Sequence, residues 1–553
     1  TASELLDYVM VCGKLDCPIP VNLLLRMVGS GHGVEDITRL VTGIDLIRWS
    51  GDNEDDVYVQ PRLRLEAEMI CSRRLGGPRV EAEFAVRLIQ RSMPSVYRSG
   101  ERRFVIELVR RLGPAGPYRS AYAERYLNIA RALTELREKK NVVDPSLMLQ
   151  EATLRRRSVK DAPSQRETPE TVLEEARAVV DRALSEFSGA SGAGLKRVCA
   201  DLKVERAAIY GYLAVQKLKH GGSTVDVWNF YMAARDAARS AVAAADGYYA
   251  LDVSLWAAAD LFRDGQWGQA RKAELTADIW DAMGRVEPQV LDPEQLERFY
   301  KRQYQISQTL KDERLSEESF AALEQAGSLA GYYLKARELG GGDLNRREAA
   351  RGEDVAKAEQ AAKYLEEHFE RVSDDPRCLR YLLQARWLSC TGTFLFGGDR
   401  SPLPTEDKDV SNLLGLVQRV VGAQGALGDL QLRYLEAVLL WRLRREKDAS
   451  DVWRELDRDS EYRERRRVSR QHVWTSFDGR TPRLFQGRVV SEEGGRGRVR
   501  VLVEEIKQEV DLMRSEFGQT EMRRGATVVG GFHIAFNYIG PIADRPDRRM
   551  GHA

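Results

Sequence analysis

The chain has 553 residues, 43% of them hydrophobic and 31% charged, which is long enough for about three or four domains with buried cores. Its 85 basic and 84 acidic residues leave a formal net charge of +1, which excludes a general attraction to nucleic acid or to an anionic membrane. The six cysteines are scattered, and no apolar run reaches the roughly 20 residues that a bilayer-spanning helix needs, so we expect a cytoplasmic protein without a membrane partner.

Residues 1–75 are predicted to form a winged-helix domain. Apolar residues at helical spacing predict helices at 3–12, 20–28 and 34–42, and two β-type runs at 47–49 and 57–59 flank a polar turn. Three helices followed by a hairpin indicate a winged helix. Because the helical pattern is already under way at the first residues, we expect that this chain continues a longer polypeptide.

Helical patterns dominate the next four hundred residues. We expect linking helices at 76–117 and an irregular α-solenoid, similar to tetratricopeptide repeats, at 118–470. Four helix starts are marked by a capping residue directly before proline, at Asp144, Thr168, Asp292 and Asp375. Segments such as WNFYMAARDAARSAVAAA pair small and aromatic residues, as expected where a small residue on one helix admits a ring from another.

The rest of the chain departs from helical spacing. Two stretches inside the helical region, 340–354 and 397–409, are rich in glycine or acidic residues and are predicted to be exposed loops. After Trp474 the hydrophobic period changes to two, which predicts a small β domain at 471–545, a five-stranded barrel or sandwich. Strand is expected only in the wing and after about residue 480, and 546–553 is expected to be a disordered tail. The predicted fold class is therefore mainly α.

The sequence shows no catalytic constellation. The closest approach to a phosphate-binding loop, GASGAGLKR at 189–197, has Leu195 where that loop requires lysine and lacks a preceding strand. Cys12 and Cys17, with His32 and Cys71, could form a zinc site, but we favour buried cysteines in the core. The six histidines lie outside any nucleophile or metalloprotease motif, and we expect no cofactor or metal in this chain.

Basic clusters favour an alternative function. Arginines gather in YRERRRVSRQ (462–471) and in the first predicted strands of the β domain, where aromatic residues could stack on bases. The residues that would contact phosphates are Arg465, Arg466, Arg467, Arg496, Arg498 and Arg500. Glutamates interleave with the strand arginines, which favours a solvated surface of mixed charge over a nucleic-acid site. An adaptor that binds RNA or DNA through 462–500 is thus the competing hypothesis.

The stretch VYVQPRLRLEAEMI, residues 57–70, joins the predicted wing to the first linking helix. Pro61 ends the strand, Arg62 and Arg64 follow it, and Glu66 and Glu68 fall in the first helical turns, where carboxylates favour the helix dipole. We interpret these four charged residues as a regulatory hinge. The alternative is ordinary charge at a helix start.

A winged helix whose wing runs into R-x-R-x-x-A-E, followed by a helical array, resembles the part of signal-transducing NTPases with numerous domains, the STAND class, that follows the ATPase core. The resemblance implies an upstream NTPase domain that binds ATP, a sensor that binds a protein partner, and assembly into an oligomer. Many bacterial members are immune sensors, so it also implies a role in antiphage defence. Family members often carry histidine near the arginines to contact the nucleotide, whereas this chain has Leu63. An enzyme in its own right is a third interpretation.

Overall fold

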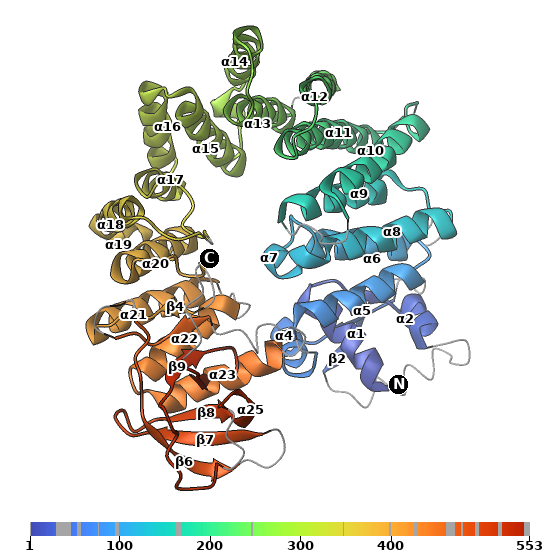
Figure 1. The fold of residues 1–553 in the computed structure, drawn as a ribbon. Coiled ribbons are helices and arrows are strands. Elements are labelled where there is room, and N and C mark those ends of the chain that lie inside the picture. Colours follow the sequence, from blue (N-terminus) through green and yellow to red (C-terminus); the bar gives the residue numbers. More distant parts are fainter. Residues whose placement is uncertain are drawn as a thin grey trace. The chain divides into compact units, whose positions relative to one another are not determined.

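The computed structural model describes residues 2–28, 46–51, 57–75, 77–94, 99–161, 167–189, 191–244, 247–346, 348–397, 400–424, 430–460, 471–476, 479, 481–492, 497–517 and 522–546. The chain divides into two compact units, residues 1–319 and 320–553, and each contains its own hydrophobic clusters. The ribbon in Figure 1 shows that helices make up most of both units and that strands gather near the C-terminal end of the sequence.

The first unit begins with a small sheet among helices. Its elements are α1 (Ala2–Lys14), β1 (Ile19–Pro20), α2 (Val21–Val28), β2 (Ile47–Ser50) and β3 (Tyr58–Pro61). The sheet order is β1-β3-β2 with antiparallel pairs, and Trp49 lies opposite Val59. The predicted hairpin is confirmed. The predicted helix at 34–42 lies outside the described residues, so the winged helix stays a prediction.

Helices follow in the order that the periodicity predicts, each starting near an expected signal. Asp144, Thr168, Asp292 and Asp375 all accept hydrogen bonds from backbone N–H groups in the first turn of the helix that follows them, which confirms the four predicted starts. No described helix is both long and apolar enough to cross a membrane. The helices of the first unit after β3 are α4 (Arg64–Arg74), α5 (Pro78–Arg91), α6 (Ser99–Leu112), α7 (Arg119–Tyr122), α8 (Tyr126–Lys139), α9 (Pro145–Asp161), α10 (Pro169–Glu186), α11 (Ala193–Lys219), α12 (Thr224–Ala244), α13 (Tyr248–Asp264), α14 (Gln269–Gly284) and α15 (Pro293–Leu310).

From α9 to α15 the helices form two layers. Helices α9, α11, α13 and α15 pack on one another in sequence, while α10 and α12 each pack on the two helices that adjoin them in the chain and α14 packs on α13. Each pair therefore buries its apolar faces against the next pair, as in helical-repeat proteins. The expected pairing of small and large residues is present: a Cβ at Gly211 of α11 would lie 2.7 Å from the ring of Trp256 on α13.

The second unit combines helices with a sheet. Helix α16 (Glu313–Gln325) crosses the boundary between the units. The remaining elements are α17 (Ala330–Leu339), α18 (Gly352–Glu367), α19 (Phe369–Val372), α20 (Pro376–Thr391), β4 (Ser401–Pro402), α21 (Asp407–Gln424), α22 (Leu430–Arg442), α23 (Glu446–Ser460), β5 (His472–Val473), β6 (Gly487–Glu492), β7 (Arg498–Val503), β8 (Glu509–Met513), α25 (Arg514–Phe517), β9 (His533–Phe536) and β10 (Pro541–Asp544). The sheet has the strand order β4-β5-β9-β10-β8-β7-β6, with parallel pairs at β4/β5 and β8/β10.

The prediction that 397–409 is an exposed loop was wrong for the central part of that stretch. The expectation that no strand occurs between the wing and residue 480 was also wrong. Residues 400–404 are buried, Ser401 and Pro402 form the edge strand β4, and strand β5 at 472–473 is its partner. The N–H groups of Ser401 and Leu403 donate to the carbonyls of Gln471 and Val473 at 2.8 and 3.1 Å. Because proline lacks an N–H group, a strand that contains it is tolerated at a sheet edge, and sequence alone does not distinguish that strand from a loop.

The segment that leads into β9 also pairs with the start of β6 and with the residues just before it. Phe485 and Phe532 exchange backbone hydrogen bonds of 2.8 and 3.0 Å, and the N–H of Val528 donates to the carbonyl of Gly487 at 3.0 Å. The last strand of the order, β6, is thereby connected to the chain just before β9. This pairing supports the predicted barrel-like closure, which stays a prediction.

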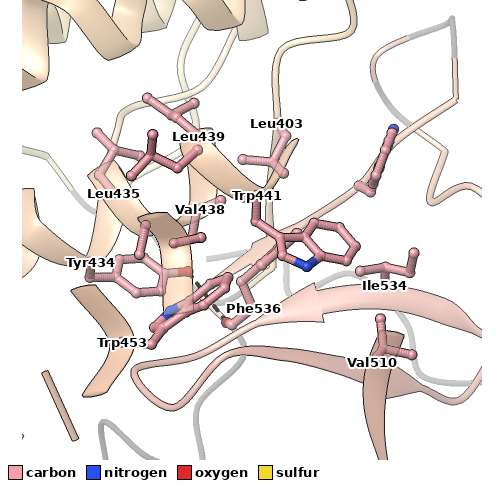
Figure 2. Close-up of a cluster of buried hydrophobic side chains, with 14 of the residues drawn as sticks. Leu403, Tyr434, Leu435, Val438, Leu439, Trp441, Trp453, Val510, Ile534 and Phe536 are labelled. Carbon is pink, nitrogen blue, oxygen red and sulfur yellow. Dashed lines mark hydrogen bonds between the residues drawn. The ribbon is translucent and has the colours of Figure 1, made fainter. Parts of the chain in front are cut away.

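One hydrophobic cluster joins the last helices to the sheet. Figure 2 shows Tyr434, Val438 and Trp441 of α22 packed toward Phe536 of β9, with Leu403 beside them. The hydroxyl of Tyr434 donates to the carbonyl of Phe536 at 3.3 Å. The helices α20 to α23 and the β strands therefore share a core.

Buried His472 predicts an acid-sensitive second unit. Its Nε2–H donates to the carbonyl of Leu395 at 3.1 Å, and its Nδ1 lies 3.0 Å from the hydroxyl of Tyr434. Burial lowers its pKa to about 4 from its ordinary value. The imidazole of His472 binds a proton more tightly in the unfolded chain than in the folded unit. The free energy of unfolding is therefore fully retained above about pH 6.5 and falls by about 3 kcal/mol as the pH drops toward 4. His472→Gln should flatten this dependence in urea denaturation at several pH values. An unchanged pH profile would contradict the buried neutral imidazole.

Candidate regulatory hinge

The turn between β3 and α4 places the predicted hinge residues. Pro61 is buried against α1, where a Cβ at Gly13 would lie only 2.1 Å from the Pro61 ring. The N–H of Arg62 donates to the carbonyl of Leu46 at 2.9 Å, and Leu63 keeps an extended backbone before α4 begins at Arg64. The change from strand to helix therefore occurs within three residues, and Pro61 at its start packs against α1.

Arg64 and Glu68 meet through a tyrosine that the sequence analysis did not select. The Arg64 Nη2 donates to the Tyr118 hydroxyl at 2.7 Å, and that hydroxyl donates to Glu68 Oε1 at 2.7 Å. A direct bond of 3.1 Å joins Arg64 Nε to Glu68 Oε1. Burial raises the pKa of Tyr118, with Glu68 acting in the same direction. We name Arg64, Glu68 and Tyr118 the hinge triad.

A buried ion pair lies beside the hinge triad. The Lys14 Nζ of α1 donates to both oxygens of Glu81 on α5, at 2.7 and 2.8 Å, and the Tyr122 hydroxyl donates to Glu81 Oε2 at 2.5 Å. The side chains of Lys14 and Glu81 are only 4% and 1% exposed. Burial, followed by the Glu81 carboxylate, raises the pKa of Tyr122 well above its usual range.

The two groups of residues touch at Tyr118. The Lys14 ammonium lies 5.4 Å from the centre of the Tyr118 ring, and the Arg64 guanidinium lies 5.7 Å from it. Two cations thus contact one ring, at a distance where an aromatic face attracts positive charge. The contact connects the solvent-facing hinge triad to the buried pair.

The four predicted hinge residues differ in their surroundings. Arg64 and Glu68 are brought together, while the Arg62 side chain is exposed. Glu66 is half-buried, and its Oε2 has no hydrogen-bond partner among the described residues. The residues that sequence analysis missed are Tyr118, Lys14, Glu81 and Tyr122. A lysine directly after the apolar run YVMVCG was a usable signal, because a cation at that position needs a buried counter-charge.

Three exposed side chains at the start of α4 are apolar. Leu63 and Leu65 are 59% and 65% exposed, and Met69 lies one turn after Leu65 on the same face. These side chains cannot donate hydrogen bonds to a phosphate. These three side chains are therefore suited to apolar contact beside the charged residues Arg62 and Arg64.

The three cysteines of the possible zinc site are part of the core. Cys12, Cys17 and Cys71 are buried, as predicted, and burial raises the pKa of Cys71 to about 12. His32 lies outside the described residues. No group of three potential ligands with metal-binding geometry occurs among the described residues. The Nδ1–H of His533 donates to the carbonyl of Arg483 at 2.9 Å, as expected of a satisfied sheet residue.

The arginines of the nucleic-acid alternative are paired with carboxylates where the structure describes them. Arg498 on β7 lies 3.4 Å from Asp511 of β8, and Arg500 lies 3.7 Å from Glu509 of the same strand. Arg465, Arg466, Arg467 and Arg496 lie outside the described residues. Arg498 and Arg500 therefore form a surface of mixed charge with the carboxylates of β8.

We expect the chain to bind a labelled single-stranded oligonucleotide only weakly in about 0.15 M salt, because these ion pairs reduce the local positive field. Fluorescence anisotropy over a salt series measures this. If Arg465, Arg466 and Arg467 contact phosphates, replacing all three with glutamine makes the log–log slope shallower by about two, at roughly 0.7 per contact. A sub-micromolar complex that weakens steeply with salt would instead establish the nucleic-acid function.

No family model matches the chain, and no curated relative matches it. A crystal structure of a signal transduction ATPase with numerous domains, with a tetratricopeptide repeat sensor, from Pyrococcus horikoshii is 12% identical with a TM-score of 0.30. That match covers 81% of this chain and 62% of the other. A circular tandem repeat protein with novel repeat topology and enhanced subunit contact surfaces is 14% identical with a TM-score of 0.22, covering 84% and 94%. TM-scores this low do not establish a shared fold, so neither protein's activity carries over to this chain.

Proposed function

We propose that this chain is the non-catalytic sensor and regulatory part of a STAND-like signalling protein, and that its helical array binds a protein partner. The observation that carries the proposal is the hinge triad. It joins the start of α4 to the start of α7, which precedes the helical layers, and it contacts the buried Lys14–Glu81 pair through Tyr118. A change in the packing of the helical array would therefore reach the module formed by α1 and β1 to β3.

The hinge triad costs little energy to rearrange and the Lys14–Glu81 pair costs much, a difference that suits a switch. Arg64 and Glu68 are partly exposed, and an exposed ion pair contributes only about 0–1 kcal/mol, so the hinge triad can rearrange at little cost. The Lys14–Glu81 pair is buried, and separating its partners is costly. Partner binding that favours one arrangement of the hinge triad would shift the population without unfolding α1 and α5.

The resemblance to the STAND class supplies the finer parts of the proposal. ATP would bind to an NTPase domain outside this sequence, since this chain has Leu63 between Arg62 and Arg64, where family members often carry the histidine that contacts the nucleotide. Assembly of several copies in the cytoplasm would follow partner binding, and recognition of a phage component is the role proposed for bacterial members. These parts rest on the RLRLEAE motif and on module order.

The hinge double variant Arg62→Ala with Arg64→Ala should leave the fold intact, because each exposed contact contributes at most about 1 kcal/mol. It should raise hydrogen exchange in α4 and in 118–122, and change the partner-dependent output of the full-length protein. Tyr118→Phe, which removes the hydroxyl that bridges Arg64 and Glu68, should act in the same direction.

Arg73→Ala, an exposed arginine on the same helix, is the matched control and should change neither measurement. Loss of folded protein in the double variant would show that these arginines are structural. Exchange and output identical to wild type would remove the hinge from the proposal.

A further inference from the structure

Helices α7 and α8 are parts of one helical run that a short 3₁₀ segment interrupts. The 3₁₀ helix η1 (Ala123–Arg125) joins α7 directly to α8, so every residue from Arg119 to Lys139 is helical. The backbone departs from α-helical torsions on both sides of η1, with φ −101° and ψ 0° at Tyr122 and φ −109° and ψ −4° at Arg125. A 3₁₀ stretch inside a longer helix often marks a hinge or a sequence under strain.

The sequence does not require this interruption. Residues 118–139 contain neither glycine nor proline, the two residue types that strongly oppose an α-helix. Tyr118, Tyr122 and Tyr126 follow one another at intervals of four, which in a continuous α-helix places them on one face. That face would lie on the same side as the buried Leu133 of α8. An uninterrupted, amphipathic helix is therefore a second arrangement open to the same residues.

Three tyrosine hydroxyls hold the interrupted arrangement. The Tyr126 hydroxyl donates to the carbonyl of Arg119 at 2.9 Å, a hydrogen bond that spans η1. The Tyr122 hydroxyl donates to the buried carboxylate of Glu81 on α5, and the Tyr118 hydroxyl bridges the hinge triad. Two of the three hydroxyls therefore bond to α4 and α5, and the interruption is fixed by contacts from outside the helical run.

Conversion of η1 to α-helix would separate α7 from these partners. A 3₁₀ helix turns by about 120° and rises by about 2.0 Å per residue, against about 100° and about 1.5 Å in an α-helix. Over the length of η1 the difference amounts to a rotation of about 60° and a shortening of about 1.5 Å. At the radius of about 5 Å where helical side chains lie, this rotation moves a side chain by about 5 Å. The Tyr118 and Tyr122 hydroxyls cannot keep bonds of 2.7 and 2.5 Å through such a movement.

The helical array contacts η1 directly. Helix α9, the first of the two layers, lies beside α8 in Figure 1 and packs on both α8 and η1. Burial, followed by Asp161 of α9, raises the pKa of Tyr126 to about 12, so α9 lies close to the hydroxyl that spans η1. Helix α8 is anchored by its buried face on α5 and α9. A change at η1 would therefore move α7 while α8 keeps its place.

We propose that η1 is a switch that couples the helical array to the hinge triad. In one state η1 is 3₁₀, and Tyr118 and Tyr122 are bonded to α4 and α5. In the other state, favoured when α9 shifts, residues 119–139 form one continuous α-helix and both hydroxyls leave their partners. The proposal rests on the proposed function, because it names the moving element that would carry partner binding from the array to the hinge triad.

Hydrogen exchange of the full chain without a partner, resolved to single residues, tests the switch. The triple variant Tyr118→Phe, Tyr122→Phe and Tyr126→Phe removes the three hydroxyls and keeps the rings. Each lost hydrogen bond shifts the equilibrium by about twofold to tenfold, so the continuous helix should predominate. Exchange should then become faster in α4, which loses Tyr118. It should become slower at 123–126, where the N–H groups gain α-helical bonds to the carbonyls of 119–122.

Two further variants separate the switch from a general loss of stability. Ala123→Gly, added to the triple variant, should reverse both changes in part, because glycine opposes an α-helix by about fivefold relative to alanine. Tyr231→Phe is the matched control. Tyr231 is a buried tyrosine of α12 whose hydroxyl donates to Asp278 at 2.6 Å, and its loss should change exchange neither in α4 nor at 123–126. Circular dichroism checks that each variant is folded.

Faster exchange both in α4 and at 123–126 in the triple variant would overturn the switch, because it would show that the hydroxyls only stabilise this region. Unchanged exchange at 123–126, or a pattern that Ala123→Gly does not reverse, would overturn it as well. These results would leave the proposed function standing, since the output of the hinge variants decides that. Hinge variants with normal output would remove the proposed function and leave the exchange pattern of the switch unaffected.

Discussion

Glu81→Ala is expected to lower the free energy of unfolding of the first unit by about 3–5 kcal/mol, because it leaves the Lys14 ammonium buried without a counter-charge. It also removes the acceptor of the Tyr122 hydroxyl, which is itself buried. Urea denaturation of the full chain should show an earlier first transition. Hydrogen exchange should rise in α1 and α5, which locates the effect at the pair.

Glu83→Ala on the same helix is the matched control. Glu83 pairs with Arg79 at 3.4 Å, but both side chains are about half exposed, so the expected cost is at most about 1 kcal/mol. The triple variant Lys14→Met, Glu81→Leu and Tyr122→Phe replaces the polar group with apolar side chains and should recover much of the lost stability. A cost for Glu81→Ala no larger than for Glu83→Ala would refute the buried pair.

Leu403→Ala is expected to destabilise the second unit by about 2–5 kcal/mol, the range for truncating a buried leucine. Leu403 is 1% exposed, it lies in the cluster that α22 shares with β9, and its N–H pairs with Val473 (Figure 2). Because residues 400–404 pack between helices and sheet, the variant should also expose this segment to limited proteolysis. Urea denaturation and cleavage rates near residue 403 measure the two effects.

Leu484→Ala is the comparison in the same unit. Leu484 is 51% exposed, so its truncation should change stability by no more than about 0.5 kcal/mol and should leave the cleavage of 400–404 unchanged. Equal small effects for both leucines would mean that the segment before α21 is the exposed loop that the sequence predicted.

Local features of the fold were predictable because they depend on neighbouring residues. Aspartate or threonine before proline fixes a helix start through its own side chain, and all four such positions begin helices as predicted. The hairpin of β2 and β3 follows from two β-type runs, and the change of period marks β6 to β9. The pairing of Gly211 with Trp256 shows that small and aromatic residues in the helical segments indicated packing between helices.

The sequence by itself therefore determined the helical character of the chain, the burial of Cys12, Cys17 and Cys71, and the position of the charged turn after Pro61. Only the tertiary structure decided which charges meet. Tyr118 lies 54 residues beyond Arg64, and Glu81 lies 67 beyond Lys14, so no local pattern connects them. The same holds for β4, which pairs with a strand about 70 residues later. Hydrogen bonds and burial between distant segments are set by how the elements pack, and the period of a single segment carries no record of its partner.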